Sequence, residues 1–296
     1  MTPEISALLV DLESAGYVAE PATATALFLA RATQKPLLVE GDAGVGKTEL
    51  AKVLAQLLNT ELIRLQCYEG LDVQTALYEW DYPRQMLRLR IADGRGEDPT
   101  ALEARLFSRE YLLERPLLRA ITHQGAPAVL LIDEIDRADD GFEAFLLEVL
   151  SDFQVTIPEL GTIKAQHPPQ VILTSNRTRE LGDALRRRCL YLYLDHPTLE
   201  REVRIIRARC PEAGGMLPEQ IARFLQALRA LSLVKPPGVA ETLDFTRALL
   251  SLRQPALEAE VVTQTLGCLL KDRHDLETVT PTEVEAMVAS AREVRS

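Results

Sequence analysis

The chain has 296 residues, more than one compact core of ordinary size contains, so we expect one large domain and one smaller domain. Its composition, 47% hydrophobic and 26% charged, excludes a disordered or collagen-like chain. The net charge of -11 argues against a nucleic-acid partner. The apolar runs are shorter than the ~20 residues that a membrane-spanning helix needs.

The first two thirds of the chain alternate short apolar runs with helical patterns. Apolar runs that predict strands cover 36–40, 61–67, 128–133, 171–176 and 190–194. Helical spacing follows the first run and continues at 101–124 and 142–150. Strands that are apolar on both faces are typical of a parallel sheet with helices on each side. The sequence therefore predicts a three-layer α/β/α fold.

Two features interrupt or end this pattern. Alternating residues on either side of PELG predict a β-hairpin over about 153–166. Beyond DHPT the strand pattern does not return, so we expect an α/β domain over 1–195 and an all-helical domain over 196–296. The four cysteines are scattered, and the acidic start is unlike a secretory leader. Both features predict a cytoplasmic protein with reduced thiols.

A glycine-rich loop follows the first predicted strand. It fits the pattern G-x-x-x-x-G-K-[ST] and consists of Gly41, Asp42, Ala43, Gly44, Val45, Gly46, Lys47 and Thr48. Its backbone N–H groups and the start of the next helix are suited to hold phosphates. Lys47 is placed to reach the β- and γ-phosphates, and the Thr48 hydroxyl to hold Mg²⁺. An ordinary glycine-rich turn is the alternative, which the strand–loop–helix context disfavours.

Polar side chains end two other predicted strands. VLLIDEID places Asp133 and Glu134 at the end of an apolar run, and Asn176 ends VILTSN. Asp133 is suited to take Mg²⁺ through its water shell, and Glu134 to orient or deprotonate an attacking water. Asn176 could hydrogen-bond both that water and the γ-phosphate. A solvated acidic turn and an ordinary turn asparagine are the alternatives.

These motifs together resemble the AAA+ ATPases, a class of P-loop NTPases with a helical lid domain. Residues 41–48 match their Walker A loop, 129–134 their Walker B strand, and Asn176 their sensor 1 position. The hairpin and an extra helix-2 insert over about 78–96 are similar to the MoxR family. Within it, TSNRTREL and ALRRRCLYLYLDHP are similar to the branch that accompanies maturation of molybdenum–copper carbon monoxide dehydrogenase.

The resemblance predicts a role for the arginines in DALRRRC. AAA+ proteins work as rings, and an arginine of one subunit reaches the γ-phosphate that its neighbour holds. Arg188 aligns best with that arginine finger, with Arg186 and Arg187 as the other candidates, and a solvated helix end as the alternative. Arg247 lies near the sensor 2 position, with an exposed helix arginine as the alternative. Tyr68 lies where ring unfoldases carry a pore loop, with an ordinary surface turn as the alternative.

The resemblance implies a MgATP-hydrolysing hexameric ring that remodels a protein client. The client would be a metalloenzyme under assembly, reached in trans through an adaptor with a von Willebrand factor A (VWA) domain. Two other functions stay open at this point: a DNA-directed AAA+ motor or loader, and a nucleotide-gated switch with little turnover. The acidic charge disfavours the first, and Glu134 disfavours the second.

Overall fold

A computed structural model of the chain describes residues 1–93 and 98–293. The chain separates into two compact units. The first comprises Met1–Pro21, Gly41–Val53 and the chain from Tyr193 onward, and the second comprises Ala22–Glu40 and Leu54–Leu192. The glycine-rich loop is thus in the same unit as the C-terminal helices. The domain boundary at 195 stays a prediction.

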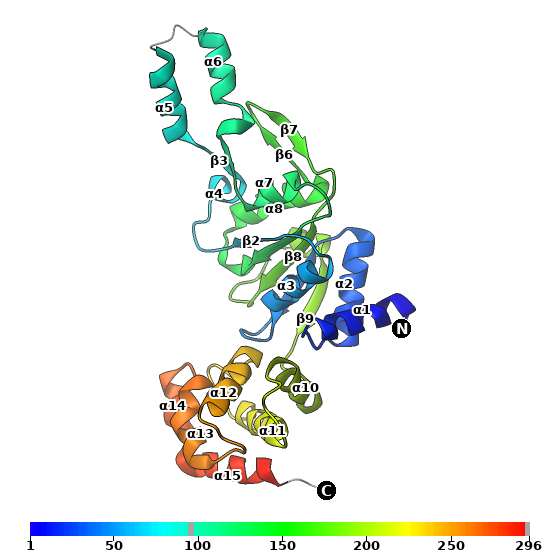
Figure 1. Ribbon diagram of the computed structural model, residues 1–296, viewed down its shortest axis with the longest axis vertical. Helices are drawn as coiled ribbons and strands as arrows, with labels where there is room; N and C mark the ends of the chain where they lie inside the picture. The colour runs from blue at the N-terminus through cyan, green and yellow to red at the C-terminus, as the bar shows by residue number, and fades with distance from the viewer. Residues whose placement is uncertain (94–97, 294–296) are drawn as a thin grey trace. The chain divides into compact units, whose positions relative to one another are not determined.

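A parallel five-stranded sheet is the centre of the fold. Its strands are β1 (Leu37–Gly41), β2 (Leu62–Gln66), β5 (Val129–Asp133), β8 (Gln170–Ser175) and β9 (Leu190–Leu194), in the order β2-β5-β8-β1-β9 (Figure 1). β5 pairs in parallel with β2 and β8, and β8 with β1. All residues of β1 and β5 are buried, as strands covered on both faces require. The predicted α/β class is confirmed, and the carboxyl ends of these parallel strands share one edge.

The chain before β9 also contains helices, most of which flank the sheet (Figure 1). In chain order they are α1 (Pro3–Ser14), α2 (Pro21–Thr33), α3 (Lys47–Leu57), α4 (Val73–Leu77), α5 (Tyr82–Asp93), α6 (Pro99–Leu106), α7 (Pro116–Thr122), α8 (Asp140–Asp152) and α9 (Asp183–Arg188), with short 3₁₀ turns η1 (Arg109–Tyr111) and η2 (Ile135–Arg137). α8 shows why such segments fold: Phe142, Leu146, Val149 and Leu150 recur at helical spacing and are all buried in one core. The Asp139 carboxylate caps this helix by accepting from the Phe142 N–H at 2.8 Å.

The expected helix over 101–124 is wrong in its middle. A short strand, β4 (Leu112–Glu114), separates α6 and η1 from α7 and pairs antiparallel with β3 (Tyr78–Trp80). Pro116 explains the break, because proline opens α7 and keeps Arg115 extended, at φ -87° and ψ 172°. The leucine spacing in this region resembled one helix because the two short helices that flank β4 are both apolar on one face.

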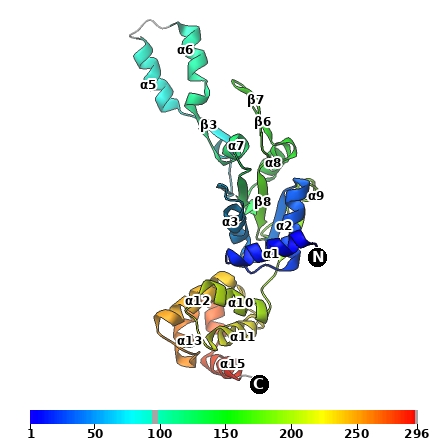
Figure 2. The ribbon, with the colours of Figure 1, turned by 45° about the vertical axis from the view of Figure 1, so that its right-hand side comes forward.

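The hairpin and the insert lie in the second unit. β6 (Gln154–Ile157) and β7 (Gly161–Lys164) form the antiparallel hairpin that the alternation predicted. The insert expected over about 78–96 consists of β3 and α5, and its last residues lie outside the described residues. Both views show α5 and α6 side by side, beyond β3 at the end of this unit (Figures 1 and 2).

The described chain after β9 is helical, as predicted. It contains α10 (Leu199–Arg209), α11 (Leu217–Arg229), α12 (Val239–Ser251), α13 (Ala259–Thr265), η3 (Leu266–Cys268), α14 (Arg273–Thr278) and α15 (Pro281–Arg292). These helices share a core of their own, in which the rings of Phe224 and Phe245 stack with centroids 6.2 Å apart. Among the described residues, no helix combines the length and the apolar character that crossing a membrane requires.

Candidate functional site

The glycine-rich loop connects β1 to α3 and is closely surrounded. Gly41 leaves no room for a side chain, because a Cβ there would lie 2.2 Å from the Leu194 carbonyl oxygen. Gly44 has a φ of +79°, a conformation that side-chain-bearing residues rarely adopt. A Cβ on Gly44 would also meet the Glu241 carboxylate at 2.7 Å. The loop therefore needs its glycines for both backbone conformation and close approach.

Lys47 closes this loop from the first turn of α3. Its side chain is buried, and Nζ donates to the carbonyl oxygens of Gly41, at 2.7 Å, and Asp42, at 2.6 Å. An anion in the loop would bind this ammonium more strongly than a neutral carbonyl does, because a hydrogen bond between two charged groups is the stronger one. The Thr48 side chain follows directly in the same turn and is partly exposed.

A cavity of about 240 Å³ lies beside the loop within the first unit. Residues from four segments line it, among them Tyr17, Val18, Gly46, Leu243 and Arg247. Burial raises the pKa of Tyr17 to about 12, so its hydroxyl stays protonated. The cavity combines apolar walls with the Arg247 guanidinium, whose Nη1 lies 3.3 Å from Asp244 Oδ1. Such a lining suits a flat, partly polar ligand portion next to a phosphate loop.

Asp133 is held in the second unit, at the carboxyl end of β5. It is 3% exposed, and both of its carboxylate oxygens accept hydrogen bonds. Thr174 Oγ1 donates to Oδ1 at 2.5 Å, and Arg64 Nη2 donates to Oδ2 at 2.6 Å. The strand order explains these contacts, because β2 and β8 are the two neighbours of β5. The charge of this buried carboxylate is therefore compensated and its orientation is fixed.

Glu134 turns away from the strand and is held by amides on both sides. Its φ of 56° is left-handed, which ends β5 and starts η2. Gln66 Nε2 lies 3.1 Å from Oε2, and Asn176 Nδ2 lies 3.4 Å from Oε1. The Glu134 N–H donates to Thr174 Oγ1 at 2.9 Å. Glu134 and Asn176, which the sequence singled out separately, thus lie together at the same edge of the sheet.

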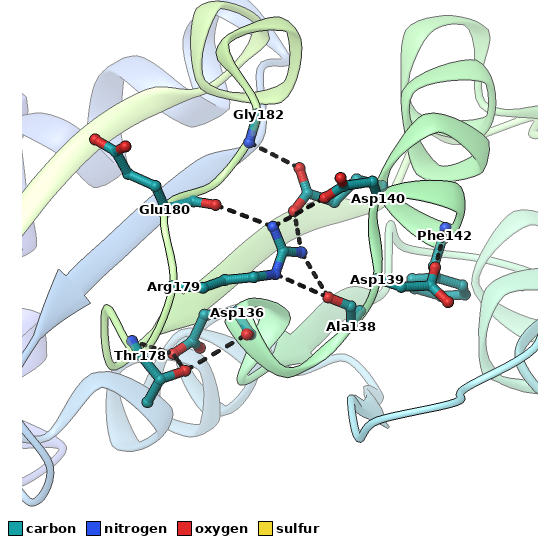
Figure 3. Close-up of polar contacts among 10 residues, drawn as sticks. Asp136, Ala138, Asp139, Asp140, Phe142, Thr178, Arg179, Glu180 and Gly182 are labelled. Carbon is teal, nitrogen blue, oxygen red and sulfur yellow. Dashed lines mark hydrogen bonds and ion pairs between the residues drawn. The ribbon is translucent and has the colours of Figure 1, made fainter.

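Asp136 fastens the segment after β8 to η2. This buried carboxylate accepts from the Thr178 N–H at 2.9 Å and from Thr178 Oγ1 at 2.6 Å (Figure 3). It also accepts from the Asn176 N–H at 3.2 Å. Burial by itself would raise the pKa of Asp136, but the hydrogen bonds from Thr178 and Asn176 outweigh it and lower that pKa. Asn176 is therefore held in place by its backbone, through a residue outside the predicted site.

Arg179 continues this attachment toward α8. Figure 3 shows its guanidinium beside Ala138, Asp140 and the backbone of Glu180. Nε donates to the Ala138 carbonyl at 3.0 Å, and Nη2 forms an ion pair with the buried Glu143 carboxylate. Glu143 in turn accepts from the Gly182 N–H at 2.9 Å. The loop between β8 and α9 is thus tied at both ends to the segment that carries Glu134.

The three consecutive arginines occupy the last turn of α9 and differ in their contacts. Arg186 lies over the Tyr191 ring at 5.8 Å, and Arg187 Nη2 is 3.8 Å from Asp183 Oδ2. Arg188 Nη1 donates to the Ala184 carbonyl at 3.2 Å, and no carboxylate of the described residues lies within ion-pair distance of it. Arg187 and Arg188 also line a cavity of about 290 Å³ with Lys35. Arg188 is therefore the cation of the three with the weakest internal compensation.

Comparison with known families decides the class of the domain. Residues 36–189, more than half of the chain, match the AAA domain family, dynein-related subfamily. The chain belongs to this AAA family. The match begins just before β1 and ends after α9, so it includes the glycine-rich loop, the carboxylates at the end of β5 and Asn176. The AAA domain is a nucleotide-binding fold of the P-loop NTPase class, and its members commonly assemble into rings.

This AAA protein is similar to relatives whose names describe no activity. Uncharacterized proteins of Staphylococcus aureus, strains USA300 and bovine RF122, are each 27% identical over 225 residues, which cover 74% of this chain and 76% of the relative. Two variants of RuvB of Thermotoga maritima have similar structures, with TM-scores of 0.50 and identities of 18% and 19%. They cover 97% and 96% of this chain, and 82% and 81% of theirs. This likeness shows the fold alone.

Sequence reasoning missed the residues that hold the carboxylates of the AAA domain. Arg64 and Gln66 come from β2, and Thr174 from β8. One signal was present: Ile63 and Leu65 are apolar and buried, whereas Arg64 and Gln66 alternate with them. That alternation marks a polar face on an otherwise apolar strand. It could have indicated a polar environment there, but not which side chains would meet.

Each unit offers an oxygen donor of the kind that a magnesium ion binds, Thr48 in the first unit and Asp133 in the second. Mg²⁺ prefers hard oxygen ligands and keeps several waters, so it needs only one or two protein oxygens beside the phosphates. The Thr48 hydroxyl and the Asp133 carboxylate are oxygen donors of this kind. Asp133 is also buried and oriented, which suits a carboxylate that holds ordered water.

Proposed function

We propose that this AAA protein hydrolyses ATP to ADP and phosphate with Mg²⁺. The observation that carries the proposal is the arrangement around Glu134: a carboxylate at the end of β5, oriented by two amides and next to a buried Asp133. The glycine-rich loop with a buried Lys47 supports it. Family membership supports it as well, because AAA proteins usually hydrolyse ATP.

In the proposed complex, the N–H groups of Gly41 to Thr48 and the Lys47 ammonium hold the phosphates. Lys47 Nζ would exchange the carbonyl oxygens of Gly41 and Asp42 for phosphate oxygens, which are stronger acceptors because they are charged. The cavity beside Gly46 receives the nucleoside, with Tyr17 and Arg247 among its walls. Thr48 and Asp133 would hold Mg²⁺, which neutralises charge on the β- and γ-phosphates.

Glu134 acts on the attacking water in this proposal. Its carboxylate accepts a proton from the water as the oxygen attacks the γ-phosphorus and the bond to the β-phosphate oxygen breaks. Asn176 Nδ2 lies 3.4 Å from Glu134 Oε1, so it is placed to orient the carboxylate and the water together. The ties from Asp136 and Arg179 keep Asn176 there.

We extend the proposal to a ring, with six subunits as the first stoichiometry to test. Arg188 is the finger that completes the site of the adjacent subunit, because its charge is the least compensated of the three arginines. A guanidinium keeps its charge and bridges phosphate oxygens, which suits stabilisation of the transition state. Arg186 and Arg187 have partners within the subunit that favour a structural role.

We further propose that the ATPase remodels a protein client in the cytoplasm, as the resemblance to the MoxR family implies. By that resemblance the client is a molybdenum–copper metalloenzyme, reached through a VWA-domain adaptor. Tyr68, exposed in the turn after β2, is a candidate to contact a client segment. Deleting the gene should leave the client polypeptide present but deficient in metal. A fully metallated client in the deletion strain would contradict this part of the proposal.

Steady-state phosphate release from ATP, with and without Mg²⁺, tests the enzymatic part. We expect turnover that requires Mg²⁺ and is unchanged by added DNA, since the chain carries a net charge of -11. Tight ATP binding without turnover would instead favour a nucleotide-gated switch. Turnover that rises severalfold with DNA would favour a DNA-directed motor.

A further inference from the structure

Arg64 connects the two carboxylates at the end of β5. Its Nη2 lies 2.6 Å from Asp133 Oδ2 and 2.5 Å from Gln66 Oε1. Gln66 in turn contacts Glu134, since its Nε2 donates to Glu134 Oε2 at 3.1 Å. A continuous chain of hydrogen bonds therefore runs from Asp133 through Arg64 and Gln66 to Glu134. Arg64 and Gln66 share one face of the edge strand β2, which places both beside β5.

The contact with Asp133 places a permanent cation where a metal-bound water would be held. A guanidinium does not lose its charge at accessible pH, so it cannot leave by deprotonation. Thr174 already donates to Asp133 Oδ1, so Oδ2 is the oxygen for which Arg64 and a hydrated metal ion would compete. The Arg64 side chain is 51% exposed, whereas that of Asp133 is 4% exposed. Arg64 can therefore move into water, and Asp133 stays in place.

We propose that Arg64 competes with the divalent cation for Asp133 and so sets the Mg²⁺ concentration that the AAA domain requires. The inference rests on the proposed role of Asp133 toward Mg²⁺. If Asp133 held a hydrated metal ion through Oδ2, Arg64 would leave this oxygen, and Gln66 would lose the donor that holds its Oε1. Gln66 would then hold Glu134 less firmly. Arg64 is thus a positioning residue that links metal occupancy at Asp133 to the freedom of Glu134.

Metal-dependent binding of a non-hydrolysable nucleotide tests this without any turnover. The full-length protein is titrated with Mg²⁺ in the presence of fluorescent adenylyl imidodiphosphate, and with Mn²⁺ by electron paramagnetic resonance. Arg64→Gln removes the cation and keeps a hydrogen-bonding group. We expect it to lower the half-saturating metal concentration by about two- to tenfold, the range of a partly exposed charged pair. Arg64→Lys keeps the charge and should stay closer to the wild-type value.

Arg119→Gln is the matched control, because Arg119 forms an ion pair with the exposed Glu61 and makes no contact with Asp133 or Glu134 in the described structure. It changes the net charge equally and should leave the metal titration unchanged. If Arg64→Gln fails to fold, Arg64→Met, which keeps the aliphatic stem, gives the same readout.

An unchanged or higher metal requirement in a folded Arg64→Gln protein would overturn the competition, while the proposed ATPase function would stand. An equal decrease in Arg119→Gln would also overturn it, because the effect would then follow net charge. If the wild-type protein bound neither metal nor nucleotide, both the inference and the proposed function would fail.

Discussion

Replacing Asp136 tests whether the segment that carries Asn176 is held by this buried carboxylate. Asp136→Ala removes the acceptor of three hydrogen bonds, from the Asn176 N–H, the Thr178 N–H and Thr178 Oγ1. The change leaves a gap at a position that is 3% exposed. Among the acidic residues labelled in Figure 3, Asp136 should be the one whose replacement destabilises the second unit most.

The size of the effect follows from the environment of each donor. A hydrogen bond to a charged group contributes about 1.5–3 kcal/mol, but the three bonds share one acceptor and do not add. Thr178 is exposed, so water replaces part of what its groups lose. We therefore expect Asp136→Ala to lower the free energy of unfolding by about 2–3 kcal/mol. Asp136→Asn keeps one acceptor oxygen and should lower it by about 1 kcal/mol.

The single tryptophan, Trp80, provides the assay. It is buried in the core of the second unit, so its fluorescence during urea denaturation reports the unit that contains Asp136. Asp140→Ala is the control: it removes a carboxylate that also contacts the network, but its side chain is 97% exposed. Exposed pairs contribute little, so we expect a change under about 0.5 kcal/mol.

The pH dependence gives a second check with a definite sign. The folded protein lowers the pKa of Asp136 below its ordinary value of 3.8. The stability that this shift contributes is therefore fully present well above pH 3.8, and is lost as pH falls through the folded pKa. The difference in unfolding free energy between wild type and Asp136→Asn should be full at pH 7 and smaller at pH 3. Equal stabilities of wild type, Asp136→Ala and Asp140→Ala at pH 7 would refute the reasoning.

Two predictions concern the loop and the arginines. Lys47→Ala should weaken ATP binding at least tenfold in calorimetry, whereas Lys52→Ala, which removes an exposed lysine of the same helix, should not. Arg188→Ala should bind ATP normally and hydrolyse it poorly, because the finger acts on the transition state of the adjacent subunit. Mixing Arg188→Ala with Lys47→Ala subunits should restore part of the activity. Mixed rings, verified by sedimentation, that stay inactive would contradict a finger acting in trans.

The strands and the main carboxylates could be predicted because local signals determine them. The runs at β1 and β5 are apolar on both faces, which only a covered parallel sheet explains. Glu134 and Asn176 follow neighbouring parallel strands, so their contact follows from strand direction once the sheet order is known. The glycine positions of the loop could also be predicted, because Gly44 adopts a backbone conformation that favours glycine.

The missed features depend on contacts between distant residues. Arg64 meets Asp133 only because β2 lies next to β5, and no local pattern gives that neighbour. The pairing of β3 with β4 was hidden for a similar reason, since three residues at Leu112–Glu114 carry too short a pattern to oppose the helical spacing around them. The role of Asp136 could not be predicted either, because it depends on the turn after β8, whose N–H groups donate to this carboxylate.

The most direct test of the proposed ATPase is Glu134→Gln, measured for binding and hydrolysis in the same preparation. The amide keeps the size of the side chain but cannot accept the proton of the attacking water. We expect ATP to stay bound with its affinity nearly unchanged, and single-turnover hydrolysis to fall by ~10²–10⁴-fold, the usual contribution of a general base. Hydrolysis at the wild-type rate by Glu134→Gln would contradict the assignment of Glu134 and with it the proposed mechanism.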